Sequence, residues 1–139
     1  MAVKLSKNGK VAVASNTVAE QGTWTLTISN ELAEAGAFSD DWKKIAGKTT
    51  GSWTATFSGW GDSTDTNGQI ALENAAISGT ALATIRLYED ATNYWVCDTD
   101  SDANATAYVS SYAATVDKST LNAVTFTIEG SGPVHRTSD

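Results

Sequence analysis

Residues 23–29, Thr-Trp-Thr-Leu-Thr-Ile-Ser, alternate strictly between hydroxylated and apolar side chains. The alternation returns in residues 51–59, Gly-Ser-Trp-Thr-Ala-Thr-Phe-Ser-Gly, and in residues 124–129, Val-Thr-Phe-Thr-Ile-Glu. A period of two residues is typical of a β-strand, because successive side chains point to opposite faces. Three strands that each have one apolar and one threonine-rich face predict a half-buried β-sheet.

The rest of the chain adds shorter strands and one helix. Apolar segments bounded by turn residues predict strands at residues 11–13, 18–19, 81–88, 93–97 and 106–116. An Ala-rich segment predicts a helix over about residues 66–77, with Asp65 or Thr66 as N-cap and Gly79 after its end. The predicted fold class is mostly β: a β-sandwich or half-barrel, flanked by one α-helix that covers an open face of a sheet.

Two segments have no sustained period. Residues 30–50 predict a long loop, and a loop of this length is usually functional or disordered. Residues 130–139 contain Gly132-Pro133 and predict a mobile C-terminal arm with His135 as a solvated residue. With 139 residues, the chain fits a single domain spanning residues 1–139.

Composition excludes several classes of protein. Hydrophobic residues make up 41% of the chain and charged residues 18%, which argues against disorder. A net charge of -7 argues against a protein that holds nucleic acid by neutralising phosphates. The single cysteine excludes an internal disulfide, and no segment approaches the apolar length of a membrane-spanning helix, so no membrane partner is expected.

The sequence predicts no catalytic residues and no cofactor. The only histidine, His135, lies in the predicted arm, where a general base would lack a fixed partner. Cys97 ends the apolar segment Tyr94-Trp95-Val96, where a cysteine usually behaves as a small buried hydrophobe. The sequence has no nucleophile elbow, phosphate loop or zinc-ligand spacing. We therefore predict that the protein is not an enzyme.

No metal site is predicted either, although Asp98, Asp100 and Asp102 alternate as in the start of an EF-hand loop. Ala103 stands where that loop needs glycine, and Val109 stands where it needs glutamate. The three carboxylates are therefore interpreted as a solvated acidic loop, and they remain the candidate ligands of an adventitious cation.

Five tryptophans leave open a glycan-binding β-sandwich, which would use a flat aromatic platform. Trp24 and Trp53 alternate with threonines on amphipathic strands, so they are predicted to anchor the core. The sequence leaves Trp42, Trp60 and Trp95 as candidate residues of such a platform.

Taken in order, several motifs resemble the major tail tube proteins of long-tailed bacteriophages, over nearly the whole chain. The motifs are Asn16-Thr17-Val18-Ala19-Glu20, Phe38-Ser39-Asp40-Asp41-Trp42-Lys43, residues 51–59, residues 62–69 (Asp-Ser-Thr-Asp-Thr-Asn-Gly-Gln), and residues 126–132 (Phe-Thr-Ile-Glu-Gly-Ser-Gly). The acidic stretch of residues 98–104 departs from the family pattern, in which a glycine turn is common. Gene transfer particles and contractile inner tubes use related subunits, so the kind of particle stays open.

The resemblance implies a non-enzymatic virion protein that is made in the host cytoplasm and assembles as stacked hexameric rings into a tail tube. Inner strands of the subunits would join into a continuous β-barrel around the channel for genome ejection. Expected partners are further copies of the chain and the tape-measure, terminator and baseplate proteins. DNA is expected to pass through the channel transiently, without binding to its wall. A capsid decoration protein or another virion β-sandwich is the alternative.

Two sets of residues receive roles in this interpretation. The ring-to-ring assembly loop would use Phe38, Asp40, Asp41, Trp42 and Lys43. The channel would be lined by the hydroxylated strand faces, namely Thr23, Thr25, Thr27, Thr54, Thr56, Thr125, Thr127 and Glu129. Threonine could also occur on an outward face simply for its β propensity.

Overall fold

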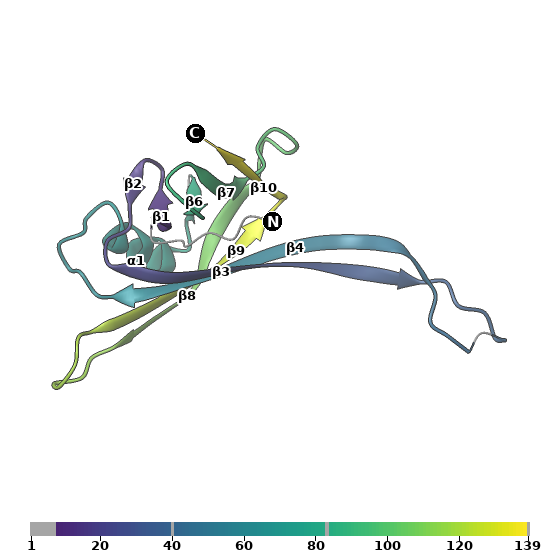
Figure 1. Ribbon diagram of the computed structural model, residues 1–139, viewed down its shortest axis with the longest axis horizontal. Coiled ribbons are helices and arrows are strands. Elements are labelled where there is room, and N and C mark those ends of the chain that lie inside the picture. The colour runs from purple at the N-terminus through teal and green to yellow at the C-terminus, as the bar shows by residue number, and fades with distance from the viewer. Residues whose placement is uncertain (1–7, 40, 83, 139) are drawn as a thin grey trace.

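The chain folds into two antiparallel β-sheets and one α-helix, in a computed structural model that describes residues 8–39, 41–82 and 84–138 (Figure 1). The strands are β1 (Lys10–Val13), β2 (Asn16–Thr17), β3 (Gln21–Glu34), β4 (Ile45–Trp60), β5 (Ala81–Leu82), β6 (Ile85–Tyr88), β7 (Asn93–Cys97), β8 (Thr106–Thr115), β9 (Ala123–Ser131) and β10 (Val134–Ser138), and the helix is α1 (Gln69–Ser78). The predicted mostly-β sandwich with one helix is confirmed.

The larger sheet has the strand order β3-β4-β9-β8-β5 and contains all three strands of the threonine pattern. Its apolar face is buried: Phe57 and Phe126 lie opposite each other in register, with ring centroids 5.3 Å apart. Trp53 is buried, and Trp24 packs against the same core, so both predicted anchors are confirmed. Gly130 lies under the Trp53 indole, where a side chain would overlap the ring.

The smaller sheet has the order β10-β7-β6-β1-β2 and lies with α1 on the apolar face of the larger one (Figure 1). Val11, Ile85 and Leu87 face the shared core from this sheet, and Leu72 and Ala75 face it from α1. Burial of these apolar side chains is the main stabilising term of such a two-layer fold.

The helix starts three residues later than about residue 66, because residues 65–68 form a turn and Gly68 is the N-cap. The Asp65 carboxylate still accepts the Gln69 backbone N–H at 2.9 Å, and Gly79 ends the helix in the left-handed conformation, as predicted. The Gln69 side chain is buried; its amide donates to Ala19 O and Trp60 O and accepts the Asp62 N–H, which ties the helix to the end of the hairpin where β3 begins and β4 ends.

The predicted loop of residues 30–50 is shorter than expected. β3 continues to Glu34 and β4 begins at Ile45, so only residues 35–44 connect the two strands. The resulting hairpin projects far beyond the rest of the molecule (Figure 1). Its outer half lacks strict alternation because residues on both faces are exposed, which removes the burial that imposes a two-residue period.

The predicted mobile arm of residues 130–139 is also corrected. β9 extends to Ser131, and β10 pairs with β7 from Val134 opposite Cys97 to Ser138 opposite Asn93. His135 is therefore half-buried in a strand and is not a solvated tail residue. Within the described ranges, no helix is both long and apolar enough to cross a membrane.

Candidate functional site

The threonine face is the side of the larger sheet that points away from the smaller sheet. Strand register places its residues in rows: Thr25 lies opposite Thr56, and Thr56 lies opposite Thr127. Directly opposed residues of antiparallel strands share a face, with Cβ atoms roughly 5 Å apart. The parallel rows are Thr27-Thr54-Glu129 and Thr23-Ser58-Thr125. The structure thus brings all eight residues of the predicted channel lining onto one continuous surface.

None of these eight side chains is buried, whereas the alternate positions of the same strands face the core, with Ile28 as the exposed exception. The hydroxyl-bearing surface is also free of cations. Strand residues 21–31, 50–60, 106–115 and 123–131 contain no lysine or arginine, and their acidic residues are Glu31 and Glu129. A polyanion that contacts this surface would find no charge to pair with.

The larger sheet has two open edges within the described part of the chain. β3 pairs only with β4 along its whole length. β8 meets β5 only at Ala107 and Tyr108, so Val109 to Thr115 have a strand neighbour only on the β9 side. Such edges present unpaired N–H and C=O groups that can pair with another chain.

The tip of the β3–β4 hairpin carries exposed aromatic rings. Phe38 is fully exposed and Trp42 is 85% exposed, so Trp42 does not cap the core of its own subunit. Lys43 forms an exposed ion pair with Glu34 at 3.1 Å, and Asp41 is exposed. Asp40 lies outside the described residues. The tip is therefore the candidate interaction site of this hairpin.

A second projecting element, the β8–β9 hairpin, was missed by the sequence interpretation (Figure 1). Val116 and Leu121 are exposed near its turn. At its base, the Tyr112 hydroxyl donates to the Glu73 carboxylate of α1 at 3.0 Å, and partial burial raises the pKa of Tyr112. The sequence signal for this hairpin is the polar turn of residues 117–120 with apolar residues on both sides of it.

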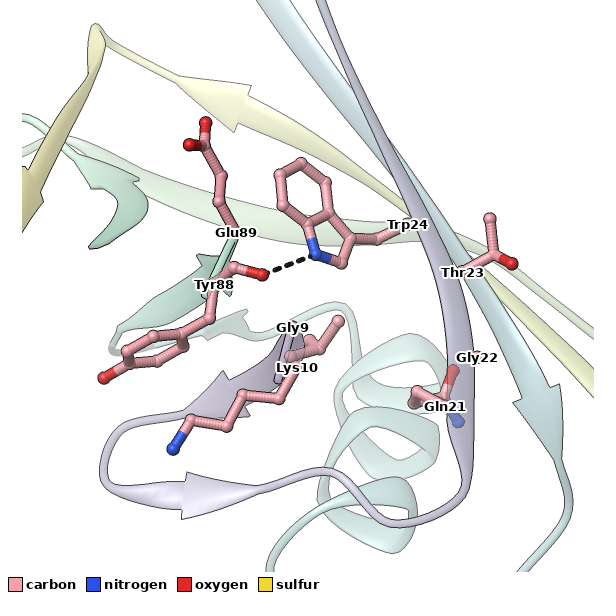
Figure 2. Close-up of a pocket in the computed structure, with 9 residues that line it drawn as sticks. Gly9, Lys10, Gln21, Gly22, Thr23, Trp24, Tyr88 and Glu89 are labelled. Carbon is pink, nitrogen blue, oxygen red and sulfur yellow. Dashed lines mark hydrogen bonds between the residues drawn. The ribbon is translucent and has the colours of Figure 1, made fainter. Parts of the chain in front are cut away.

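A hollow of about 420 Å³ lies between β1, β6 and the first residues of β3 (Figure 2). The Trp24 indole N–H crosses it and donates to the Tyr88 carbonyl at 2.9 Å. Lys10 lies over the Tyr88 ring, 4.5 Å from its centroid. The Trp24 hydrogen bond links the two sheets beside the open β3 edge, whereas the Lys10–Tyr88 contact lies within the smaller sheet.

The acidic stretch is arranged differently from the predicted Asp98, Asp100 and Asp102 set. Asp98 and Asp100 gather with His135, and the Asp102 carboxylate instead accepts the Asn104 backbone N–H at 2.9 Å. Hydrogen bonds from the Ser101 side chain and backbone hold the pKa of Asp98 below its ordinary value. Cys97 is buried, as predicted, and burial raises the pKa of its thiol.

Comparison with solved structures matches this architecture over almost the whole chain. A chain in the virion of a native gene transfer agent (GTA) particle has a TM-score of 0.77 at 9% sequence identity, covering 97% of this chain and 99% of that chain. The SPP1 tail tube matches with a TM-score of 0.64 at 15% identity, covering 97% and 79% respectively. The chain has the tail-tube fold.

A third similar structure is the sheath-tube complex of an extracellular contractile injection system, PVC, in its extended state. It matches with a TM-score of 0.62 at 14% identity and covers 99% of this chain and 93% of that chain. No protein-family model matches the sequence, and no curated protein matches it. At these identities the likeness concerns the fold.

Proposed function

We propose that this protein is the structural subunit of a phage-type tail tube, which polymerises as stacked hexameric rings around a channel for genome ejection. The observation that carries the proposal is the cation-free threonine face, which runs unbroken across a sheet with two open edges. The likeness of the whole chain to subunits of a GTA virion and of the SPP1 tail tube supports the same role. The protein would act as a building block of the virion tail, not as an enzyme.

Ring closure would join the β3 edge of one subunit to the β8 edge of the next. Such a contact is heterologous, and it forms a closed ring when the rotation between subunits completes a circle. Joined in this way, the larger sheets make one β-barrel. The smaller sheet and α1 cover the apolar face, so the threonine face is left to line the channel.

Stacking of rings would use the tip of the β3–β4 hairpin. The exposed rings of Phe38 and Trp42 would bury against an adjacent ring, beside the charged residues Asp41 and Lys43. An apolar aromatic anchor with a polar rim is the usual anatomy of a binding hot spot. The tape-measure, terminator and baseplate proteins would bind the assembled tube.

The channel surface suits a conduit because each lysine that neutralises a phosphate releases counterions and strengthens DNA binding. Hydroxyl groups and the Glu129 carboxylate leave the DNA free to slide. Trp24 and Trp53 pack in or against the core, so they cannot contribute to a flat glycan-binding platform. This placement disfavours the glycan-binding alternative.

Sedimentation and electron microscopy of the purified protein across a concentration series test the assembly, with and without tail-initiating components. We expect a monomer that converts to rings or tubes. A chain that stays monomeric under all these conditions would contradict the proposal.

Lysine substitutions test the lining. Thr25→Lys and Thr56→Lys, made separately, should leave tubes intact but slow DNA ejection, because each ring then presents a circle of cations to the phosphates. Asn74→Lys on the exposed side of α1 is the control with the same charge change. Unchanged ejection in the Thr25 and Thr56 variants, or equal slowing by Asn74→Lys, would show that this face does not line the channel.

A further inference from the structure

We propose that Asp98, Asp100 and His135 form a binding site for a divalent first-row transition metal such as Zn²⁺, independent of the tube-forming surfaces. The three residues each offer one ligand atom, and these atoms all lie within 4.8 Å of one another. His135 comes from β10, whereas the two aspartates follow β7, so the set joins residues that are distant in sequence.

Strand pairing positions the two ends of the set. His135 lies opposite Val96 in the β7–β10 pair, and the Asp98 N–H continues the ladder by donating to Pro133 O at 2.9 Å. The Asp98 carboxylate is oriented further, because it accepts the Ser101 backbone N–H at 3.1 Å and the Ser101 hydroxyl at 2.8 Å. Two of the three ligands are therefore held in place by the fold.

The distances fit a small metal ion. His135 Nδ1 and Asp98 Oδ1 are 2.9 Å apart. Two ligands that are each roughly 2.1 Å from an ion are about 3.0 Å apart at right angles and about 3.4 Å apart in the tetrahedral geometry of Zn²⁺, so binding of Zn²⁺ requires these two atoms to separate by about 0.5 Å. The ion would replace the proton that Nδ1 shares with the carboxylate. The Asp100 carboxylate is exposed and lies within 4.8 Å of the other two ligand atoms, so it would have to move closer to complete three-point ligation.

The surroundings leave room for the ion and for coordinating water. Asp100 and His135 line a hollow of about 320 Å³ on the outer side of the smaller sheet, together with the hydroxyl-bearing residues Thr99 and Thr137. Arg86 lines the same hollow, but its guanidinium lies over the Tyr94 ring, 4.9 Å from the centroid. Two carboxylates against one guanidinium leave the site with a net negative charge.

The donor chemistry selects the class of metal. One imidazole nitrogen with two carboxylate oxygens suits Zn²⁺ and related first-row ions. Ca²⁺ prefers six to eight oxygen ligands, so it should bind this set poorly. A bound ion would cross-link the turn after β7 to β10, the edge strand of the smaller sheet.

Binding of Zn²⁺ to the full-length, tag-free protein tests the proposal by calorimetry and by NMR of the imidazole. His135 is the only histidine, so its ring signals need no assignment. We expect one Zn²⁺ per chain, a shift of the Nδ1 signal at stoichiometric metal, and a Tm that rises with Zn²⁺. An equal response to Ca²⁺ would contradict the donor argument.

Variants identify the ligands. Asp100→Asn, at an exposed position that leaves the fold intact, should weaken Zn²⁺ binding at least tenfold, and His135→Asn should abolish it. Asp102→Asn, in the same loop but outside the cluster, should bind as the parent does, and so should Cys97→Ser. Unchanged affinity in Asp100→Asn, or loss of binding in Asp102→Asn or Cys97→Ser, would overturn the assignment.

Discussion

Replacement of Trp42 by alanine separates the assembly role of the hairpin tip from a role in the fold of the subunit. Trp42 is 85% exposed in the isolated chain. A tryptophan side chain presents about 200 Å² to water, and burial of the 85% that is exposed here removes about 170 Å², which at roughly 25 cal/mol per Å² contributes at most about 4 kcal/mol to a ring-to-ring contact. Side-chain ordering on binding costs about 1 kcal/mol of this. Loss of about 3 kcal/mol corresponds to a critical concentration for polymerisation roughly 100-fold higher.

The subunit itself should be nearly unaffected, because substitutions at exposed positions usually change stability by less than about 0.5 kcal/mol. Circular dichroism and thermal unfolding measure the monomer, and sedimentation against concentration measures assembly. Trp53→Ala is the opposite case, since a buried tryptophan truncated to alanine should destabilise the monomer by about 3 to 5 kcal/mol.

Ile77→Ala is a matched control, because Ile77 on α1 is also 85% exposed. It should polymerise as the parent chain does. If Trp42→Ala unfolds the monomer, or assembles at an unchanged critical concentration, the assembly role of the hairpin tip is wrong. An equal defect in Ile77→Ala would attribute the effect to general loss of apolar surface.

Two further predictions concern the subunit fold. Gly130→Ala should lower the free energy of unfolding, measured by chemical denaturation, by about 1 to 3 kcal/mol, because the new methyl group overlaps the Trp53 indole. Gly22→Ala is the control and should be better tolerated, because a methyl group at Gly22 meets open space. The lowered pKa of Asp98 contributes stability that is present above the ordinary pKa of 3.8 and is lost as pH falls through the lowered pKa. In the presence of a metal chelator, the difference in Tm between the parent protein and Asp98→Asn should therefore become smaller below about pH 4. A difference in Tm that stays constant with pH would contradict this prediction.

The sequence alone determined the strands with one buried face and the composition of the threonine face. Alternation over residues 23–29, 51–59 and 124–129 is a local property, because side-chain direction in a strand reverses at each residue. The helix was found for a similar reason, with its end at Gly79 correct and its start three residues early. The predicted start is wrong because Asp65 and Gly68 form a turn before the helix. The Asp65 carboxylate in this turn accepts the backbone N–H of Ala19, a residue far away in sequence.

Only the tertiary structure decided which residues become neighbours across strands. The outer half of the β3–β4 hairpin has no buried face, so no apolar period marked it as strand. β10 is held by backbone hydrogen bonds to β7, and these bonds leave little trace in side-chain composition. The same pairing brings His135 to Asp98 and Asp100, where the sequence had placed Asp102 instead. Spacing along the chain reports local geometry, whereas strand edges, projecting hairpins and this cluster depend on long-range pairing.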